Sequence, residues 1–126
     1  MLFRSILNLL EIGVDDPNAT VFKPIASSSP LPVGRWPSGY FTTISSNNGY
    51  EPIIWTVSRS PNHTTPMTLL AYRGLPKAGG ADLPMLYSAP VGTWSFKLNS
   101  NITPVVANGK VYVAGDSQVM IFGLAP

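Results

Sequence analysis

Residues able to do acid–base or metal chemistry are few in this chain of 126 residues. His63 is the single histidine, and it stands in a stretch rich in Ser, Pro, Asn and Thr between Ser58 and Pro66. A histidine can act as a general base or a metal ligand, but an exposed loop histidine is usually just solvated. We therefore predict no catalytic role for His63.

Aspartates supply the other chemical candidates, because carboxylate oxygens are ligands that calcium prefers. Asp15 and Asp16 precede Pro17 and Asn18, and Asp116 lies in a Gly-Asp-Ser turn. The first pair lacks the glycine-centred spacing of a calcium loop, and Asp is an ordinary turn former. The chain has no cysteine, and it has no nucleophile elbow, phosphate loop or zinc signature. We predict no catalytic, cofactor-binding or metal-binding residue.

Two tryptophans offer flat rings on which a quinone or a sugar can stack. Trp55 lies between Ile54 and Thr56, and Trp94 follows Gly92-Thr93. Aromatic side chains bury large areas when sheets pack together, so packing between sheets is the expected role of both rings.

The composition indicates a β-rich globular chain. Hydrophobic residues make up 44 % and charged residues only 11 %, and there are 11 glycines and 13 prolines. Few charges with many turn formers favour short strands joined by tight loops. The net charge of +2 comes from scattered basic residues, so no basic patch argues for nucleic acid or anionic lipid.

The C-terminal stretch from Thr103 to Leu124 predicts an antiparallel meander of three strands. Asn108-Gly109 favours a type I′ turn, whose two central residues need positive φ. The strands are expected at 105–106, 110–114 and 119–122, with a second turn at 115–117.

A longer copy of this meander lies between Thr43 and Leu75. Asn48-Gly49 matches the later Asn-Gly turn, and strands are expected at 43–46, 53–57 and 69–72. An outer strand at 85–87 can follow. Matched repeats predict two antiparallel sheets packed face to face. The residues expected to be largely buried are Ile54, Trp55, Val111, Val113 and Ile121.

The N-terminal third has weaker signals. Residues 1–14 carry apolar residues at helical spacing and are expected to form a strand or a short helix. The apolar run after Arg4 is broken by Asn8 and Glu11, and it is too short for a signal peptide or a membrane span. Prolines and serines from Asp15 to Tyr40 predict an irregular connection or an extended edge segment, which Trp36 and Phe41 anchor against the sheet.

The segment TPVVANGKVYVAGDSQVMIFGL resembles the closing blade of bacterial β-propellers built from pyrroloquinoline-quinone-like (PQQ-like) repeats. The upstream TISSNNGYEPIIWTVSRS and TLLAYRGL resemble the preceding blade. The resemblance implies an all-β fold of antiparallel meander sheets, about two blades of a partial propeller. Residues 41–126 would be the two PQQ-like blades, and residues 1–40 an irregular N-terminal segment and connection.

The same resemblance carries expectations about function. Quinoprotein repeats have an A-x-D-x-x-T-G-x-x-x-W segment, but here Arg73 stands at the Asp position, the Thr-Gly is missing and Tyr87 is nearest the Trp position. We therefore expect a non-catalytic scaffold or binding module without cofactor. The alternatives are the C-terminal part of a quinoprotein-like dehydrogenase, using PQQ and calcium, and a secreted carbohydrate-contacting propeller.

A closed propeller needs more blades than this chain supplies. The chain is therefore expected to be a fragment whose partners are the remaining propeller blades or another chain. The alternative is a small two-sheet β domain that is complete in itself. Expressed alone, the fragment is expected to aggregate or oligomerise, because unpaired apolar faces and strand edges drive association. The family resemblance alone points to a periplasmic or secreted location.

Overall fold

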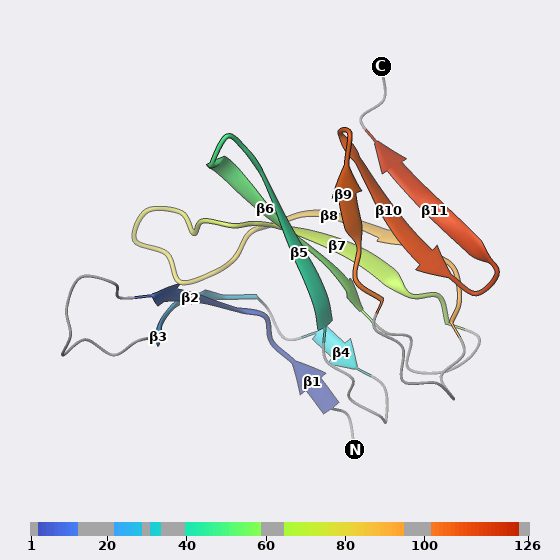
Figure 1. The fold of residues 1–126 in the computed structure, drawn as a ribbon. Coiled ribbons are helices and arrows are strands. Elements are labelled where there is room, and N and C mark those ends of the chain that lie inside the picture. Colours follow the sequence, from blue (N-terminus) through green and yellow to red (C-terminus); the bar gives the residue numbers. More distant parts are fainter. Residues whose placement is uncertain are drawn as a thin grey trace.

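The computed structural model describes residues 3–12, 22–28, 31–33, 40–58, 65–94 and 102–123. Within these ranges the chain is all-β, its sheets are antiparallel and no helix occurs (Figure 1). The strands are β1 (Phe3–Ser5), β2 (Asn8–Ile12), β3 (Phe22–Ser27), β4 (Leu31–Val33), β5 (Tyr40–Asn47), β6 (Tyr50–Ser58), β7 (Thr68–Arg73), β8 (Met85–Pro90), β9 (Val105–Ala107), β10 (Lys110–Gly115) and β11 (Gln118–Gly123).

The two predicted meanders are present. Strands β5-β6-β7-β8 form one four-stranded sheet, and β9-β10-β11 form a three-stranded sheet. Asn108 and Gly109 have φ of 51° and 69°, and Asn48 and Gly49 have 49° and 83°, which is the positive-φ pair that a type I′ turn requires. The predicted outer strand is β8, which pairs with β7.

The first copy of the turn is followed by an irregularity. The pairing of β5 with β6 shifts between Ser45 and Asn47, and Glu51 takes a φ of 49° at this point. An extra residue in one strand of a pair makes such a bulge. Pro52 lies at the same place, where the strand can tolerate a residue without a backbone N–H.

The N-terminal third contributes strands rather than a helix. β2 pairs with β3, and β1 pairs with β4. β3 and β4 lie in the Pro-rich stretch that was predicted to be irregular or extended, and each pairs on one side only within its sheet. Pro24 and Pro32 are tolerated in such strands because an unpaired edge needs no backbone donor.

Three of the four sheets stack on one another as layers. Between the four-stranded and three-stranded sheets lies a cluster that we call the inter-sheet core, and between the four-stranded sheet and the β2–β3 hairpin lies a second cluster, the hairpin core. The inter-sheet core is Val57, Met67, Leu69, Val91, Ile102, Val111 and Val113. The hairpin core is Ala26, Ile54, Leu70, Tyr72 and Leu83, with Leu7 and Leu9 against it.

Strand β7 shows that the four-stranded sheet is buried on both of its faces. Its residues Leu69, Leu70, Ala71 and Tyr72 are all buried, so the strand has no solvent face. Leu69 packs in the inter-sheet core and Leu70 in the hairpin core. A continuous apolar run of this kind is typical of a strand covered on both faces.

The prediction of burial is confirmed for Ile54, Val111 and Val113 and is wrong for Ile121. Ile121 is 58 % exposed, and Trp55 is only partly buried. In β11 the side chains of Met120 and Phe122 pack against the inter-sheet core. Because successive side chains in a strand alternate between faces, Ile121 lies on the opposite face, which no described residue covers.

Gly74 is required for the close approach of two segments after β7. Its N–H donates to the Pro52 carbonyl oxygen at 2.6 Å, and a Cβ at this position would lie 2.8 Å from that oxygen and 2.9 Å from the Pro52 Cβ. We expect Gly74→Ala to lower the free energy of unfolding by about 1–3 kcal/mol, because the backbone must shift. Denaturant unfolding measures this loss. Gly123→Ala is the control, since a Cβ there makes ordinary contact with Lys110; an equal loss in both variants would contradict the packing argument.

Candidate functional site

One candidate surface is the free face of the three-stranded sheet, which we call the tail face. Its side chains alternate with those of the inter-sheet core along each strand. Tyr112 on β10 lies between Val105 on β9 and Ile121 on β11, and Ala114 pairs with Val119. The tail face is therefore Val105, Tyr112, Ala114, Val119 and Ile121.

The tail face is apolar and exposed at the same time. Val105, Val119 and Ile121 are 58, 60 and 58 % exposed. Single exposed apolar side chains are normal, but a contiguous apolar patch marks an interaction site. The register places these three residues in two adjacent cross-strand rows, so they form one patch.

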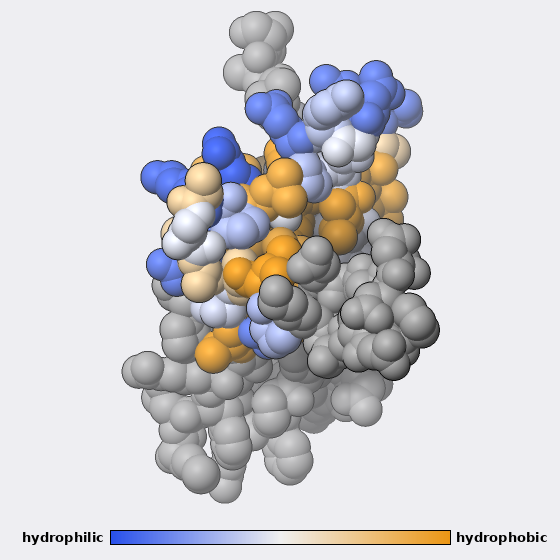
Figure 2. Space-filling model, turned by 90° about the vertical axis from the view of Figure 1, so that its left-hand side faces the viewer, coloured by the Kyte–Doolittle hydropathy of each residue, from blue (hydrophilic) through white to orange (hydrophobic). Residues whose placement is uncertain are grey.

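Apolar side chains also reach the surface outside the tail face. On the side of the molecule drawn in Figure 2, they gather in a central patch with hydrophilic side chains above it. Strand β8 adds three exposed apolar residues at the edge of the four-stranded sheet. These are Met85, Leu86 and Tyr87.

The aromatic candidates take part in packing between the sheets. Trp55 packs against the inter-sheet core, and its Nε1–H donates to the Ser45 hydroxyl at 2.8 Å. Trp94 packs against the same core. Tyr87 on β8 meets Phe122 on β11 edge to face, with ring centroids 6.2 Å apart. The predicted packing role of Trp55 and Trp94 is therefore confirmed.

Hydroxyl groups gather between the β2–β3 layer and the four-stranded sheet. The Ser28 hydroxyl accepts a hydrogen bond from the Leu7 N–H at 3.0 Å and also bonds to the Tyr72 hydroxyl. Burial raises the pKa of Tyr72, and the bond to Ser28 offsets part of that rise. The Tyr40 hydroxyl oxygen is buried and has no hydrogen-bond partner among the described residues.

Burial, together with the nearby Tyr72, raises the pKa of Tyr40 from 10.0 to about 12. The folded state thus holds this proton more tightly than the unfolded state. The resulting stability is present below pH 10 and is lost as the pH rises from 10 to about 12.

We expect Tyr40→Phe to reduce this alkaline loss of stability and to leave stability at neutral pH unchanged or slightly higher, because it removes a hydroxyl without a partner. Thermal unfolding as a function of pH measures both effects. Tyr50→Phe, on an exposed ring, serves as the control. If Tyr40→Phe lost stability at alkaline pH as the wild type does, deprotonation of Tyr40 would not be the cause of that loss.

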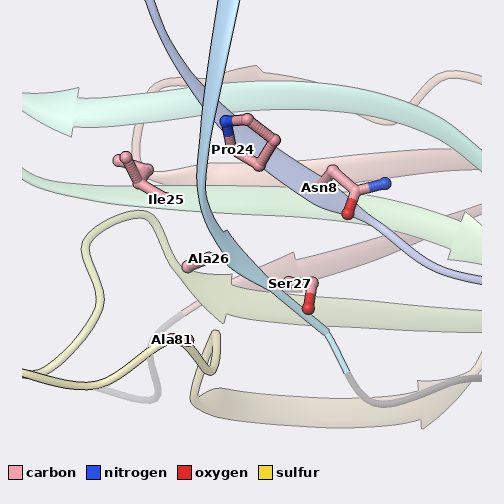
Figure 3. A pocket seen from close by; sticks show the side chains of 6 residues that line it. All are labelled: Asn8, Pro24, Ile25, Ala26, Ser27 and Ala81. Carbon is pink, nitrogen blue, oxygen red and sulfur yellow. The ribbon is translucent and has the colours of Figure 1, made fainter.

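A small hollow lies between the β2–β3 hairpin and the segment that follows Gly80 (Figure 3). Its volume is about 170 Å³, and Asn8, Ser27 and Ala81 line it together with Pro24, Ile25 and Ala26. Ser27 is held beside it, because its N–H donates to the Ala81 carbonyl at 2.8 Å. Ligand pockets are usually about 300–1,000 Å³, so this hollow is small for an organic ligand.

The charged candidates are dispersed. Asp116 is exposed in the turn between β10 and β11, as predicted, and its backbone N–H donates to the Thr93 carbonyl at 2.9 Å. Arg73 is exposed at the end of β7. His63, the Asp15-Asp16 pair and Trp36 lie outside the described residues. In the part of the chain that the structure describes, no three His, Asp or Glu side chains come together as metal ligands.

Sequence reasoning expected an unpaired apolar face but did not identify its residues, because it placed Ile121 in the core. The alternation in Lys110–Ala114 predicted a strand with two different faces, and both faces carry apolar residues. An apolar residue at every position of a strand indicates cover on both sides. The Ser28, Tyr40 and Tyr72 group had no sequence signal, since its members come from three distant segments.

Comparison with protein-family models, with curated proteins and with solved structures found no match. The described residues include no helix long and apolar enough to cross a bilayer. The fold class is thus an all-β chain of stacked antiparallel sheets, and function is argued from its surfaces.

Proposed function

We propose that this chain is part of a β-propeller of PQQ-like repeats and serves as a non-catalytic scaffold or binding module. Two meander sheets of the same strand order, each beginning with an Asn-Gly hairpin, support the proposal. They stack through the inter-sheet core, as successive repeats of a radial or stacked architecture do.

The observation that carries the proposal is the exposed tail face. The corresponding face of the four-stranded sheet is covered by the three-stranded sheet, while the tail face has no cover among the described residues. Repeat units bury their apolar faces on their neighbours, and one unit alone cannot do so. The tail face is therefore a docking surface for a further sheet.

The surroundings of the aromatic rings favour a module without cofactor. A quinone cofactor needs an open stacking ring and cationic groups for its carboxylates. Trp55 and Trp94 are instead packed against the inter-sheet core. Arg73, which stands at the position of an acid in quinoprotein repeats, is exposed at the end of β7.

Binding of the apolar dye anilinonaphthalene sulfonate tests the docking surface, because this dye fluoresces on exposed apolar surface. We expect the wild-type chain to bind the dye and Val119→Asp/Ile121→Asp to bind much less. Leu86→Asp, on the edge strand β8, is the matched control and is expected to lose less. Equal dye binding by the tail-face variant and the wild type would contradict the proposal.

Titration with pyrroloquinoline quinone and calcium, followed by tryptophan fluorescence, tests the absence of cofactor binding. We expect no saturable quenching. Saturable quenching that Trp55→Phe or Trp94→Phe abolishes would favour the quinoprotein-like dehydrogenase instead.

A further inference from the structure

The chain carries the same Asn-Gly dipeptide twice, in two different structural settings. Asn48-Gly49 joins β5 to β6 and Asn108-Gly109 joins β9 to β10, both as exposed two-residue turns. A Cβ added at either glycine would meet no atom within 4 Å, so neither turn is crowded. Asparagine is one of the thermolabile residues of proteins, and a following glycine favours its breakdown because no side chain shields the glycine nitrogen.

The reaction in question is an intramolecular loss of ammonia. The backbone nitrogen of the glycine gives up its proton to a solvent base and attacks the asparagine Cγ. The new N–Cγ bond forms, the Cγ–Nδ2 bond breaks, and ammonia leaves with a proton returned by the solvent. Water then opens the five-membered imide at either carbonyl, which gives aspartate or isoaspartate, the latter with one more methylene group in the backbone.

A type I′ turn holds the reacting atoms apart. The five-membered ring forms only when the glycine nitrogen and the asparagine Cβ lie on the same side of the asparagine Cα–C bond. In a type I′ turn, the mirror image of type I, they lie on opposite sides. Asn48 and Asn108 have φ of 49° and 51°, so both start from this unreactive conformation. Each turn must open before it reacts, and the rate at each site follows the population of its open form.

The tip of the β5–β6 hairpin is joined irregularly to the rest of its sheet. Across the shift in register, one residue of β5, Ser46, faces two residues of β6, Glu51 and Pro52. Pro52 has no backbone N–H, and Glu51 holds a φ of 49°, which is uncommon for a residue other than glycine. The pair Asn47–Tyr50, which closes the turn, is therefore separated from the regular ladder by this bulge.

Strand β7 supports only the base of this tip. It pairs with β6 from Ile53 onward, and the Gly74 N–H after it donates to the Pro52 carbonyl at 2.6 Å. No described strand pairs with Tyr50 or Glu51 on the side away from β5, so the tip is a two-stranded ribbon (Figure 1). A two-stranded ribbon is only marginally stable in water.

The β9–β10 turn is held at its very base. Lys110, directly after the turn, pairs with Ala107 on β9 and with Gly123 on β11. The pairs that follow along β10 keep an unbroken register on both sides. Val111, the next residue, is buried in the inter-sheet core. Opening of this turn therefore disturbs a strand that is paired on both sides and packed.

We infer that Asn48 is a site of spontaneous deamidation in the folded protein, whereas Asn108, in the same dipeptide, is protected by its sheet. The two sites have the same reacting groups and the same turn type, so the difference lies in how easily each tip opens. Conversion places a new carboxylate close to Glu51, and isoaspartate also lengthens the backbone of the turn. The turn residues are exposed and belong to neither core, so the stacked sheets stay in place.

Peptide mapping by mass spectrometry after incubation at mildly alkaline pH tests the inference. The peptides that contain Asn48 and Asn108 are quantified in their asparagine, aspartate and isoaspartate forms, with Asn48→Asp and Asn108→Asp as standards for the aspartate products. We expect Asn48 to be converted at least about tenfold faster than Asn108 in the folded chain. In urea both turns are open, so the two rates are expected to be similar.

The urea-unfolded chain is the control for intrinsic reactivity, and incubation continues until both of its sites are converted. Circular dichroism during the incubation reports that the other sample stays folded. Equal rates at the two sites of the folded chain overturn the inference, as does faster conversion of Asn108. A folded chain that keeps both asparagines while the unfolded chain loses both overturns it too, because the β5–β6 tip would then be held as firmly as the β9–β10 tip.

Discussion

Replacing Val113 with aspartate should abolish cooperative folding of the three-stranded sheet, whereas the same charge at Ala114 should be tolerated. Val113 is fully buried in the inter-sheet core, and Ala114 is exposed on the tail face of the same strand. Val113 packs there among apolar side chains, so an aspartate at this position would be a charge buried in an apolar environment. The cost is on the order of 4 kcal/mol or more, a large part of the stability of a small domain.

Near-ultraviolet circular dichroism and the fluorescence of Trp55 and Trp94 report the packing, because both rings lie against the inter-sheet core. In Val113→Asp the tertiary signal should be lost and the unfolding transition should become broad. Ala114→Asp should keep both signals and lose less than about 1 kcal/mol, as exposed substitutions usually do. Equal effects at the two positions would mean that β10 does not have one packed face and one free face.

Leu69→Ala should lower the free energy of unfolding by about 2–5 kcal/mol. Leu69 is 0 % exposed, and it packs with Val57 and Val111 from both sheets. The loss combines the transfer free energy of the removed methyl and methylene groups with the cavity that they leave. The upper part of the range is expected if the two stacked sheets cannot move together to close that cavity.

Leu86→Ala is the matched control, because the same atoms are removed from a leucine that is 49 % exposed on β8. Its loss should be well below that of Leu69→Ala, and the slope of the denaturant transition should stay unchanged in both variants. A small loss at Leu69 would indicate that the inter-sheet core is looser in solution and that the two sheets do not form one cooperative unit.

Local signals in the sequence determined the strands and their tight turns. Asn108-Gly109 and Asn48-Gly49 adopt the positive φ values that the turn type requires, because asparagine and glycine tolerate this region best. Period-two alternation and the matched turns predicted β6, β10 and β11 to within three residues of their observed ends. Pairing of adjacent strands followed, since a two-residue turn sets the register of a hairpin.

Only the tertiary structure decided which face of each sheet is buried and which is exposed. Ile121 looks like a core residue in sequence, yet it is exposed, because no described residue covers its face of the three-stranded sheet. Similarly, the pairing of β2 with β3, which lies in the Pro-rich stretch, and the packing of this hairpin on Ile54 and Leu70 depend on contacts between segments that are apart in the sequence. Alternation of side chains along the sequence predicts that a strand has two faces, but long-range packing determines which residues cover each face. For the same reason, the sequence showed the repeat and only the stacked layers showed which apolar faces remain free.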